Sequence, residues 1–256
     1  MPRLLIFILC GLSLLACSTT SYNPTVYKWH LDQEALKSKP IKRIIIADVN
    51  VSGEPTRSIL EKPAVKVDRK VEAYLKQHGF EIVSDHLFDN AWRQAIYAFG
   101  NFYDPTSGKV DRRGWQQVMA STLAELRNSG RVDAVLFTDV IEHDVQHSGG
   151  MQHYARWYGV TRKPATQGAG SGVPVGFDWG QTIKAASLMV TIYTVDGTPV
   201  FSSRGGMDTL HAIDLRRPDS GFVRRNKILG STSAIQEGIE LAFHPLIPMR
   251  KYPGKK

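Results

Sequence analysis

Residues 41–49, Ile41-Lys42-Arg43-Ile44-Ile45-Ile46-Ala47-Asp48-Val49, form the stretch that decides the fold. The run has the length of a strand and is rich in β-branched residues, which pack well on a pleated surface. Its hydrophobicity is nearly continuous rather than alternating, which indicates that both faces of the strand are buried. We therefore expect the first core strand here, in a sheet that helices cover on both sides.

The chain that follows alternates between helical and strand periods. Apolar residues first recur at helical spacing, and glycines stand where helices would end in a left-handed conformation. The expected elements are a helix over 67–78 ended by Gly79, a strand over 80–83, a helix capped by Ser84 with an apolar stripe from Leu87 to Phe99, a helix over 115–126 ended by Gly130, and a strand over 133–141.

A hairpin and a helix are expected late in the chain. Residues 186–193 alternate, so that the face with Ala186 and Leu188 packs on the core and the face with Ser187 and Met189 is more exposed. Asp196-Gly197 suits a tight turn before a returning strand. The last helix begins at Ser231 or at Ser233, the latter with Gln236 as a capping box, and it ends before Pro245.

Between these parts lies a Gly-rich insertion, residues 144–181, whose glycines are too frequent for a packed element. It also carries large aromatic side chains, which either pack back on the domain or meet a partner. The candidate partner-binding residues are Tyr154, Trp157, Tyr158, Phe177 and Trp179. We therefore expect an α/β (α+β) fold, a single three-layer domain with a mixed β-sheet flanked by helices, a late β-hairpin and this long insertion.

The amino-terminal residues have the layout of an export signal, with a short cationic start, an apolar run over 4–15 and a small-residue exit. The run is too short to cross a bilayer. Leu14-Leu15-Ala16-Cys17 resembles the lipobox of bacterial lipoproteins, which implies cleavage between Ala16 and Cys17 and a diacylglycerol on the Cys17 thiol. Ser18 instead of an aspartate implies, by the same resemblance, the periplasmic face of the outer membrane.

Domain organisation follows from this signal. We expect a signal peptide over 1–16, a lipidated amino terminus and tether over 17–40, where no apolar period is sustained, and a periplasmic domain over 41–256. Cys10 leaves with the signal and Cys17 carries lipid, so the mature chain has no thiol for disulfides, thiol catalysis or thiolate metal sites.

The formal charge of +8 falls to +7 once Arg3 is removed. This balance suits anionic lipid headgroups, lipopolysaccharide or acidic partners, while the expected location argues against nucleic acid. Basic residues gather late in the chain, and we expect them to form a solvated face. They are Arg204, Arg216, Arg217, Arg224, Arg225 and Lys227, with Arg250, Lys251, Lys255 and Lys256 at the end.

One group of side chains could in principle bind zinc or act as a general base: Asp139, Glu142, His143, Asp144 and His147, with His153 further on. On a strand, however, His143 and Asp144 point to opposite faces, which favours a solvated strand end. Residues 104–111 resemble a shortened calcium loop without its bidentate glutamate, and an aspartate turn followed by a helix cap explains them more simply. We expect no catalytic residue, metal or cofactor.

Four stretches together resemble the envelope lipoproteins built on the TolB N-terminal-type fold, a group that includes the curli secretion lipoprotein CsgG and the penicillin-binding-protein activator LpoB. They are residues 42–48, 79–83, 133–136 and 190–197. The resemblance covers about residues 41–143 and 182–244 and implies action by contact or assembly. We expect a lipid-anchored, non-catalytic adaptor, activator or assembly factor for another envelope component.

Two other functions stay open at this point. The first is an oligomeric outer-membrane secretion pore of the CsgG type, in which the insertion would supply membrane hairpins, although it lacks the alternating stretches of about 10 residues that transmembrane strands need. The second is an envelope hydrolase or metal-dependent enzyme that uses His143 and its neighbours. The expected partners are the membrane, through lipid on Cys17, and an envelope protein or a second copy of the chain.

Replacing Cys17 with serine tests the anchor. Because a lipid with two or more chains holds a protein stably on a bilayer, Cys17→Ser should release a soluble or unprocessed form. Membrane fractionation measures this. A processed Cys17→Ser protein that stays firmly in the outer membrane would contradict the lipoprotein prediction.

Overall fold

The computed structural model describes most of the chain beyond residue 28. The described residues are 29–47, 58–104, 110–148, 152–170, 172–217, 221–250 and 252. The predicted cleavage and lipidation residues, Ala16 and Cys17, therefore lie outside the described residues, and so do Asp48, Val49 and the turn at 105–109.

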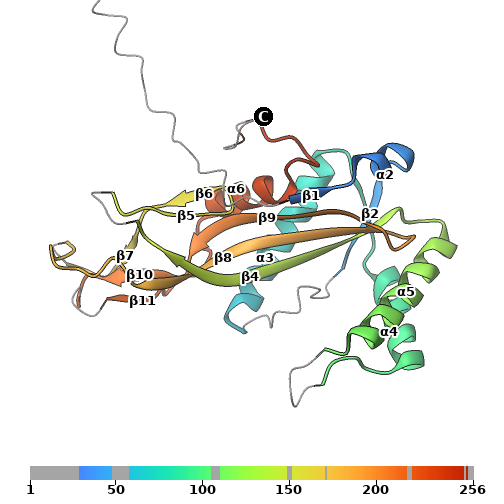
Figure 1. Cartoon of the computed structure of the whole chain (residues 1–256), viewed down its shortest axis with the longest axis horizontal. Helices are drawn as coiled ribbons and strands as arrows, with labels where there is room; N and C mark the ends of the chain where they lie inside the picture. Colours follow the sequence, from blue (N-terminus) through green and yellow to red (C-terminus); the bar gives the residue numbers. More distant parts are fainter. Residues whose placement is uncertain are drawn as a thin grey trace, which may run out of the picture.

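A mixed six-stranded sheet forms the centre of the protein (Figure 1). Three neighbouring strands, β4, β2 and β3, are parallel, and the strands from β4 to β1 are antiparallel. The order across the sheet is β1 (Trp29–Leu31), β9 (Pro199–Thr209), β8 (Thr182–Thr194), β4 (Ala134–Gln146), β2 (Arg43–Ala47) and β3 (Glu81–Val83). The predicted α+β class with a mixed sheet is confirmed.

Helices cover both faces of this sheet, as the uninterrupted apolar run of β2 predicts. Ile44 packs with α3 (Ser58–Gln77) and α6 (Thr232–Phe243), whereas Ile45 packs in a second cluster with α4 (His86–Phe99) and α5 (Arg112–Ser129). Successive strand residues point to opposite faces, so the two clusters lie on opposite sides. Both isoleucines are completely buried.

The helices α4, α5 and α6 lie where the sequence predicts them, whereas α3 begins at Ser58, before the predicted residue 67, and the cap of α4 differs from the prediction. Asp85, not Ser84, precedes α4, and it makes no side-chain capping bond. Ser231 caps α6 by accepting a hydrogen bond from the backbone N–H of Ala234, so the capping box of Ser233 and Gln236 is not formed. Gln236 instead donates to Glu240, one turn further on.

The late hairpin is formed by β8 and β9 around the predicted turn. Gly197 has a φ of 87°, and the backbone N–H of Thr194 donates to the carbonyl oxygen of Thr198. The predicted difference between the two faces is present at Met189, which is 9% exposed against 0% for Leu188, but not at Ser187, which is 0% exposed. The indole N–H of Trp157 donates to Ser187 Oγ at 3.1 Å, so part of the insertion covers this face.

Part of the predicted tether belongs to the folded domain. Residues 29–31 form β1, which pairs antiparallel with residues 201–203 of β9. The short helix α2 (Gln33–Ser38) follows, and the Asp32 side chain caps it by accepting from the backbone N–H of Ala35. The boundary predicted at residue 41 is therefore wrong, because edge pairing of a short strand needs no sustained apolar period.

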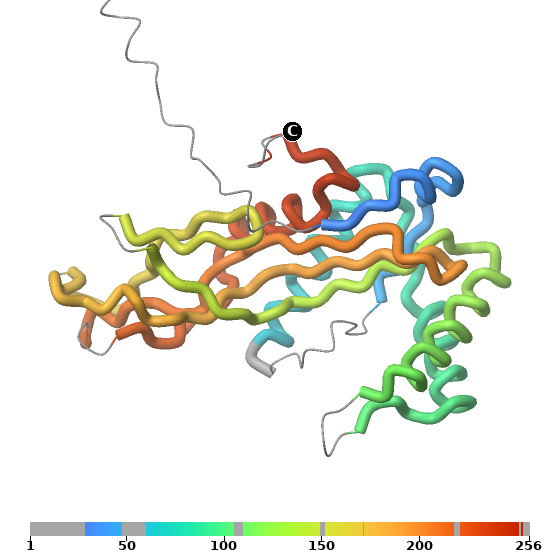
Figure 2. Tube along the Cα trace, viewed as in Figure 1, coloured from blue at the N-terminus to red at the C-terminus, as the bar shows by residue number. Residues whose placement is uncertain are grey.

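The insertion is not the irregular segment that its glycines predict. It contains three short strands, of which two form a hairpin and the third joins a small second sheet beside the main one (Figure 2). These strands are β5 (Ala155–Trp157), β6 (Val160–Arg162) and β7 (Ala165–Gln167), and the small sheet also holds β10 (His211–Asp214) and β11 (Phe222–Arg224).

Glycine in this segment serves tight turns and close contacts. Gly159 lies in the turn of the β5–β6 hairpin with a φ of 83°, and a β-carbon there would lie 2.7 Å from Leu241 Cδ2 of α6. A positive φ and so close an approach both require a residue without a β-carbon. Composition alone does not separate this use of glycine from flexibility.

Two phenylalanines of α4 provide a matched test of the core. Phe88 is completely buried between Trp92 and Phe137, whereas Phe99 on the same helix is 50% exposed. Phe88→Ala should lower the free energy of unfolding by about 3–5 kcal/mol because it leaves a cavity. Phe99→Ala should lower it by about 1 kcal/mol, since less apolar surface is lost. Urea unfolding measures both, and equal losses would contradict this packing.

Candidate functional site

Four of the five aromatic residues singled out in the insertion contact the rest of the domain, and Tyr154 forms backbone hydrogen bonds within the insertion. Trp157 and Phe177 are 3% and 8% exposed, and Trp157 packs with Val145 and Ala185 of the main sheet. Tyr158 accepts a hydrogen bond from Arg204 at its hydroxyl, and the Tyr154 carbonyl oxygen accepts from the backbone N–H of Ser148. For Trp157 and Phe177, the structure shows packing against the domain rather than an open surface.

Trp179 belongs to a cluster of rings that joins the insertion to the small sheet. Its indole stacks on His153 with ring centroids 3.6 Å apart and lies 4.8 Å from the ring of Phe177. His147, at the end of β4, stacks on Phe222 of β11 at 5.2 Å. These contacts indicate that the aromatic side chains hold the insertion in place.

The histidines and carboxylates singled out as a possible metal or catalytic group are dispersed by the fold. Glu142 forms an ion pair with Arg224 at 2.9 Å, and Asp144 forms one with Lys184 at 2.7 Å. His143 lies against the ring of Tyr158, at a centroid distance of 5.0 Å. The described part of the chain contains no group of three or more His, Cys, Asp or Glu side chains placed to hold a metal ion.

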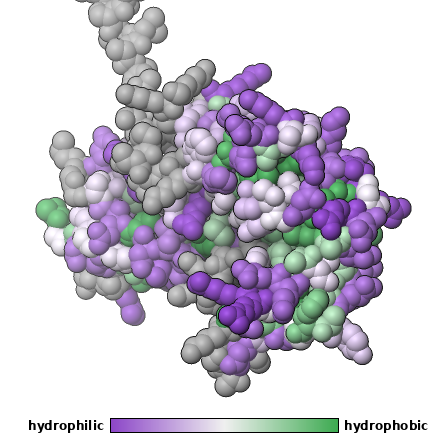
Figure 3. Space-filling model, turned by 45° about the vertical axis from the view of Figure 1, so that its right-hand side comes forward, coloured by the Kyte–Doolittle hydropathy of each residue, from purple (hydrophilic) through white to green (hydrophobic). Residues whose placement is uncertain are grey.

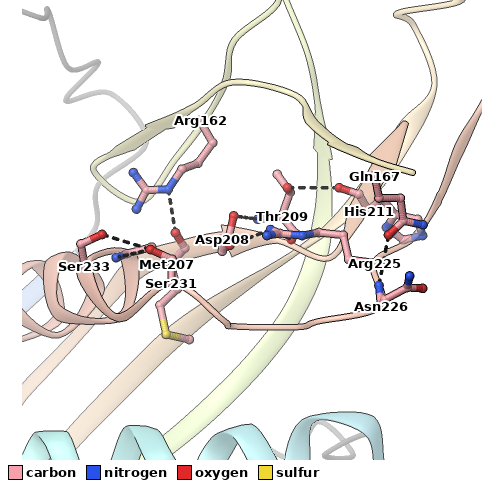
Figure 4. A network of polar contacts seen from close by, with 11 residues as sticks. Arg162, Gln167, Met207, Asp208, Thr209, His211, Arg225, Asn226, Ser231 and Ser233 are labelled. Atoms are coloured by element: carbon pink, nitrogen blue, oxygen red, sulfur yellow. Dashed lines mark hydrogen bonds and ion pairs between the residues drawn. The ribbon is translucent and has the colours of Figure 1, made fainter. Parts of the chain in front are cut away.

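Several late basic residues do not form the predicted solvated face. Arg225 pairs with Asp208 at 2.6 Å, as Arg224 does with Glu142, and both arginine side chains are largely buried. Arg162 donates to the carbonyl oxygen of Met207 and forms an ion pair with Glu237, which links the hairpin to β9 and α6 (Figure 4). This prediction is wrong for Arg224 and Arg225 because carboxylates distant in sequence fold against them.

A cavity of about 370 Å³ lies where the carboxyl ends of β2 and β3 meet α3. Such a position, between crossovers to opposite faces, is where open α/β sheets commonly bind ligands. Two acidic side chains that line the cavity already form contacts with other residues of the domain. Asp68 accepts a hydrogen bond from Thr138 at 2.9 Å, and Glu72 pairs with Lys76. We assign no reaction to this cavity.

Among the described residues, three of the four exposed phenylalanine, tyrosine and tryptophan side chains, all except Trp29 of β1, lie elsewhere, at the free end of the α4–α5 hairpin. Tyr97, Phe99, Tyr103 and Val110 are 95%, 50%, 45% and 40% exposed, and we call these four residues the aromatic tip. Hydrophilic residues cover most of the face seen in the space-filling view, with smaller hydrophobic areas between them (Figure 3). At this end of the hairpin, several large apolar side chains are exposed close together in sequence, and such exposure is a feature of interaction sites.

Ordered packing supports this tip. Gly100 ends α4 with a φ of 85°, which turns the chain toward α5. The ring of Phe102 then packs edge-on against Trp92 at 5.8 Å, and its carbonyl oxygen accepts from the backbone N–H of Asp111. Tyr103, which follows Phe102, forms an antiparallel β-bridge with Val110, which precedes Asp111. The exposed side chains are thus presented from a defined base.

Sequence reasoning missed the aromatic tip. The helical period placed Phe99 on the buried stripe, since it continues the spacing of Trp92 and Ile96. A signal was present, because residues 97–103, Tyr-Ala-Phe-Gly-Asn-Phe-Tyr, hold four aromatics around a helix-ending glycine. The apolar stripe of α4 continues beyond the sheet that the helix covers, so the side chains at its end have no sheet to pack against. Helical periodicity in the sequence does not show where the sheet ends.

Comparisons with protein-family models, with curated proteins and with solved structures found no match. The likeness to envelope lipoproteins accordingly stays a prediction from the sequence. Within the described residues, no helix is both long and apolar enough to cross a membrane. The function is argued below from the residues of this chain.

His147 makes stability dependent on pH. It is 5% exposed, its ring nitrogens have no hydrogen-bond partner in the described structure, and burial followed by the nearby His153 lowers its pKa from 6.5 to about 4. The unfolded chain binds the proton more tightly, so stability is complete above about pH 6.5 and declines as the pH falls toward 4.

His147→Phe should reduce this decline, as measured by the free energy of unfolding at pH 7 and pH 4.5. His30→Phe, on the exposed face of β1, is the control and should leave the decline unchanged. Identical declines in the wild type and in His147→Phe would show that His147 is not responsible.

Proposed function

We propose that this protein is a lipid-anchored, non-catalytic protein of the bacterial cell envelope that acts as an adaptor, activator or assembly factor. We further propose that it contacts another envelope protein through the aromatic tip. The observation that carries the proposal is the exposure of Tyr97, Phe99 and Tyr103 on an ordered base. The anchor is Cys17, as the lipobox predicts.

Physical properties of the tip support a binding role. Tyrosine and phenylalanine bury large areas when they bind, and Tyr dominates interface hot spots. A surface that is already ordered loses less conformational entropy on binding than a flexible one. The packing of Phe102 against Trp92, together with the Tyr103–Val110 bridge, provides that order.

We assign to the aromatic tip the partner-binding role that the sequence suggested for the insertion. Trp157 and Phe177 are buried within the domain, so replacing them would disturb the fold together with any contact surface. The alternative of a secretion pore needed the insertion to supply membrane hairpins, but the β5–β6 hairpin is engaged by the Trp157–Ser187 and Arg162–Glu237 contacts. On the α4–α5 hairpin, by contrast, Tyr97, Phe99 and Tyr103 are exposed.

A pair of substitutions at the tip tests this function. In membranes from the producing bacterium, a photoreactive benzoyl-phenylalanine in place of the exposed Ala98 should form adducts with the partner. Adding Tyr97→Ala and Tyr103→Ala should reduce the adducts about tenfold or more, the effect of losing interface hot spots. The melting temperature should change little, since both side chains are exposed.

Val175→Ala is the matched control, because this apolar residue in the insertion is fully exposed but distant in sequence from the tip. It should leave the adducts unchanged. Equal adduct yields from the wild type and from the Tyr97→Ala, Tyr103→Ala double variant would refute the tip as the contact surface.

A further inference from the structure

Three arginines adjoin the aromatic tip and differ from Arg162, Arg224 and Arg225 of the β-sheets. Arg93, Arg112 and Arg113 are all exposed, and none of them forms an ion pair with another described residue. Among the described residues, the Arg93 guanidinium makes one polar contact, a hydrogen bond donated to the neutral side chain of Asn90. Elsewhere, Arg162, Arg224 and Arg225 are paired with carboxylates. Positive charge is therefore available at the tip.

The nearby carboxylate of Asp111 forms no ion pair with these arginines in the described part of the chain. Its Oδ1 accepts from the backbone N–H of Arg113 at 3.0 Å, which caps the first turn of α5. Residues 90–117 contain these three arginines together with Lys109, Asp104 and Asp111, and they contain no glutamate. Interface centres are enriched in aromatic residues and arginine, so the combination of exposed aromatics and arginines at the tip is typical of a protein contact.

We infer that the tip recognises an apolar protein surface rimmed by carboxylates, with Arg93, Arg112 and Arg113 pairing with that rim. The inference rests on the proposed function and specifies its partner. Guanidinium groups bind carboxylates through two parallel charge-assisted hydrogen bonds, which fix orientation. Complementary charge also speeds encounter and excludes partners of the wrong sign.

Two other occupants fit less well. A second copy of the chain would bring the same three arginines to face each other, and like charges at an interface are repulsive. A bilayer could bind aromatics and arginines, but the placement of the tip argues against it. The tip projects on the opposite side of the sheet from β1 (Figures 1 and 2). With lipid on Cys17, eleven residues separate the anchor from Trp29, so the anchor joins the domain at β1.

The experiment uses the full lipidated chain in membranes, with the same photoreactive group at position 98. Arg112→Glu with Arg113→Glu reverses the charge, and Arg112→Lys with Arg113→Lys is the matched control that keeps it. Reversal is not expected to unfold α5, because these are its first two residues and acidic side chains are favourable at a helix amino terminus. A melting curve checks this.

We expect charge reversal to reduce the adducts about tenfold or more, and the lysine variant to retain most of them. Added salt should weaken wild-type crosslinking, since exposed charges are screened. Mass spectrometry should place the crosslink on a peptide of another protein with clustered Asp or Glu residues. Adducts with phospholipid would assign the tip to the bilayer, and adducts with a second copy would assign it to self-association; either result overturns the inference.

The two proposals fail in different ways. If the Tyr97→Ala, Tyr103→Ala variant loses its adducts while charge reversal leaves them unchanged, the tip is a contact surface but its partner is not acidic. If the aromatic variant keeps its adducts, the proposed function itself is wrong.

Discussion

Burial of β2 on both faces is the constraint on which the rest of the structure depends. Ile44 and Ile45 are adjacent and completely buried in different clusters, so each face of the sheet needs its own layer of helices. Because β2 has a parallel neighbour on each side, the chain must cross over twice, through α3 to β3 and through α4 and α5 to β4. The second crossover is a helical hairpin, and the part of it that extends beyond the sheet forms the aromatic tip.

Close backbone contacts explain how a Gly-rich segment becomes part of this domain. A β-carbon on Gly206 of β9 would clash with Val160 and Trp157 of the hairpin, and one on Gly205 would clash with the Gly238 carbonyl of α6. Strand, hairpin and helix thus meet where side chains are absent. The hydrogen bond from Trp157 to Ser187 then directs the indole into the contact, since a buried N–H needs an acceptor.

Local signals in the sequence predicted most of the core, and long-range contacts account for what they missed. The continuous apolar run of β2, the helical stripe of α3 and the Asp196-Gly197 turn each depend on residues a few positions apart, and each is present. By contrast, the pair formed by Arg224 and Glu142 joins residues 82 positions apart, so the charge pattern alone suggested a solvated face. The exposure of Phe99 was likewise decided by where the sheet ends.

A membrane anchor changes what a contact surface of this size has to achieve. Confinement through lipid on Cys17 would raise the effective concentration of the tip near other envelope proteins, so that a modest intrinsic affinity is sufficient. A few aromatics with flanking arginines are then enough for recognition, while Arg162, Arg224 and Arg225 of the sheet region are paired within the fold. Weak contact by a tethered domain is also readily reversible, which suits an adaptor or activator better than a permanent complex.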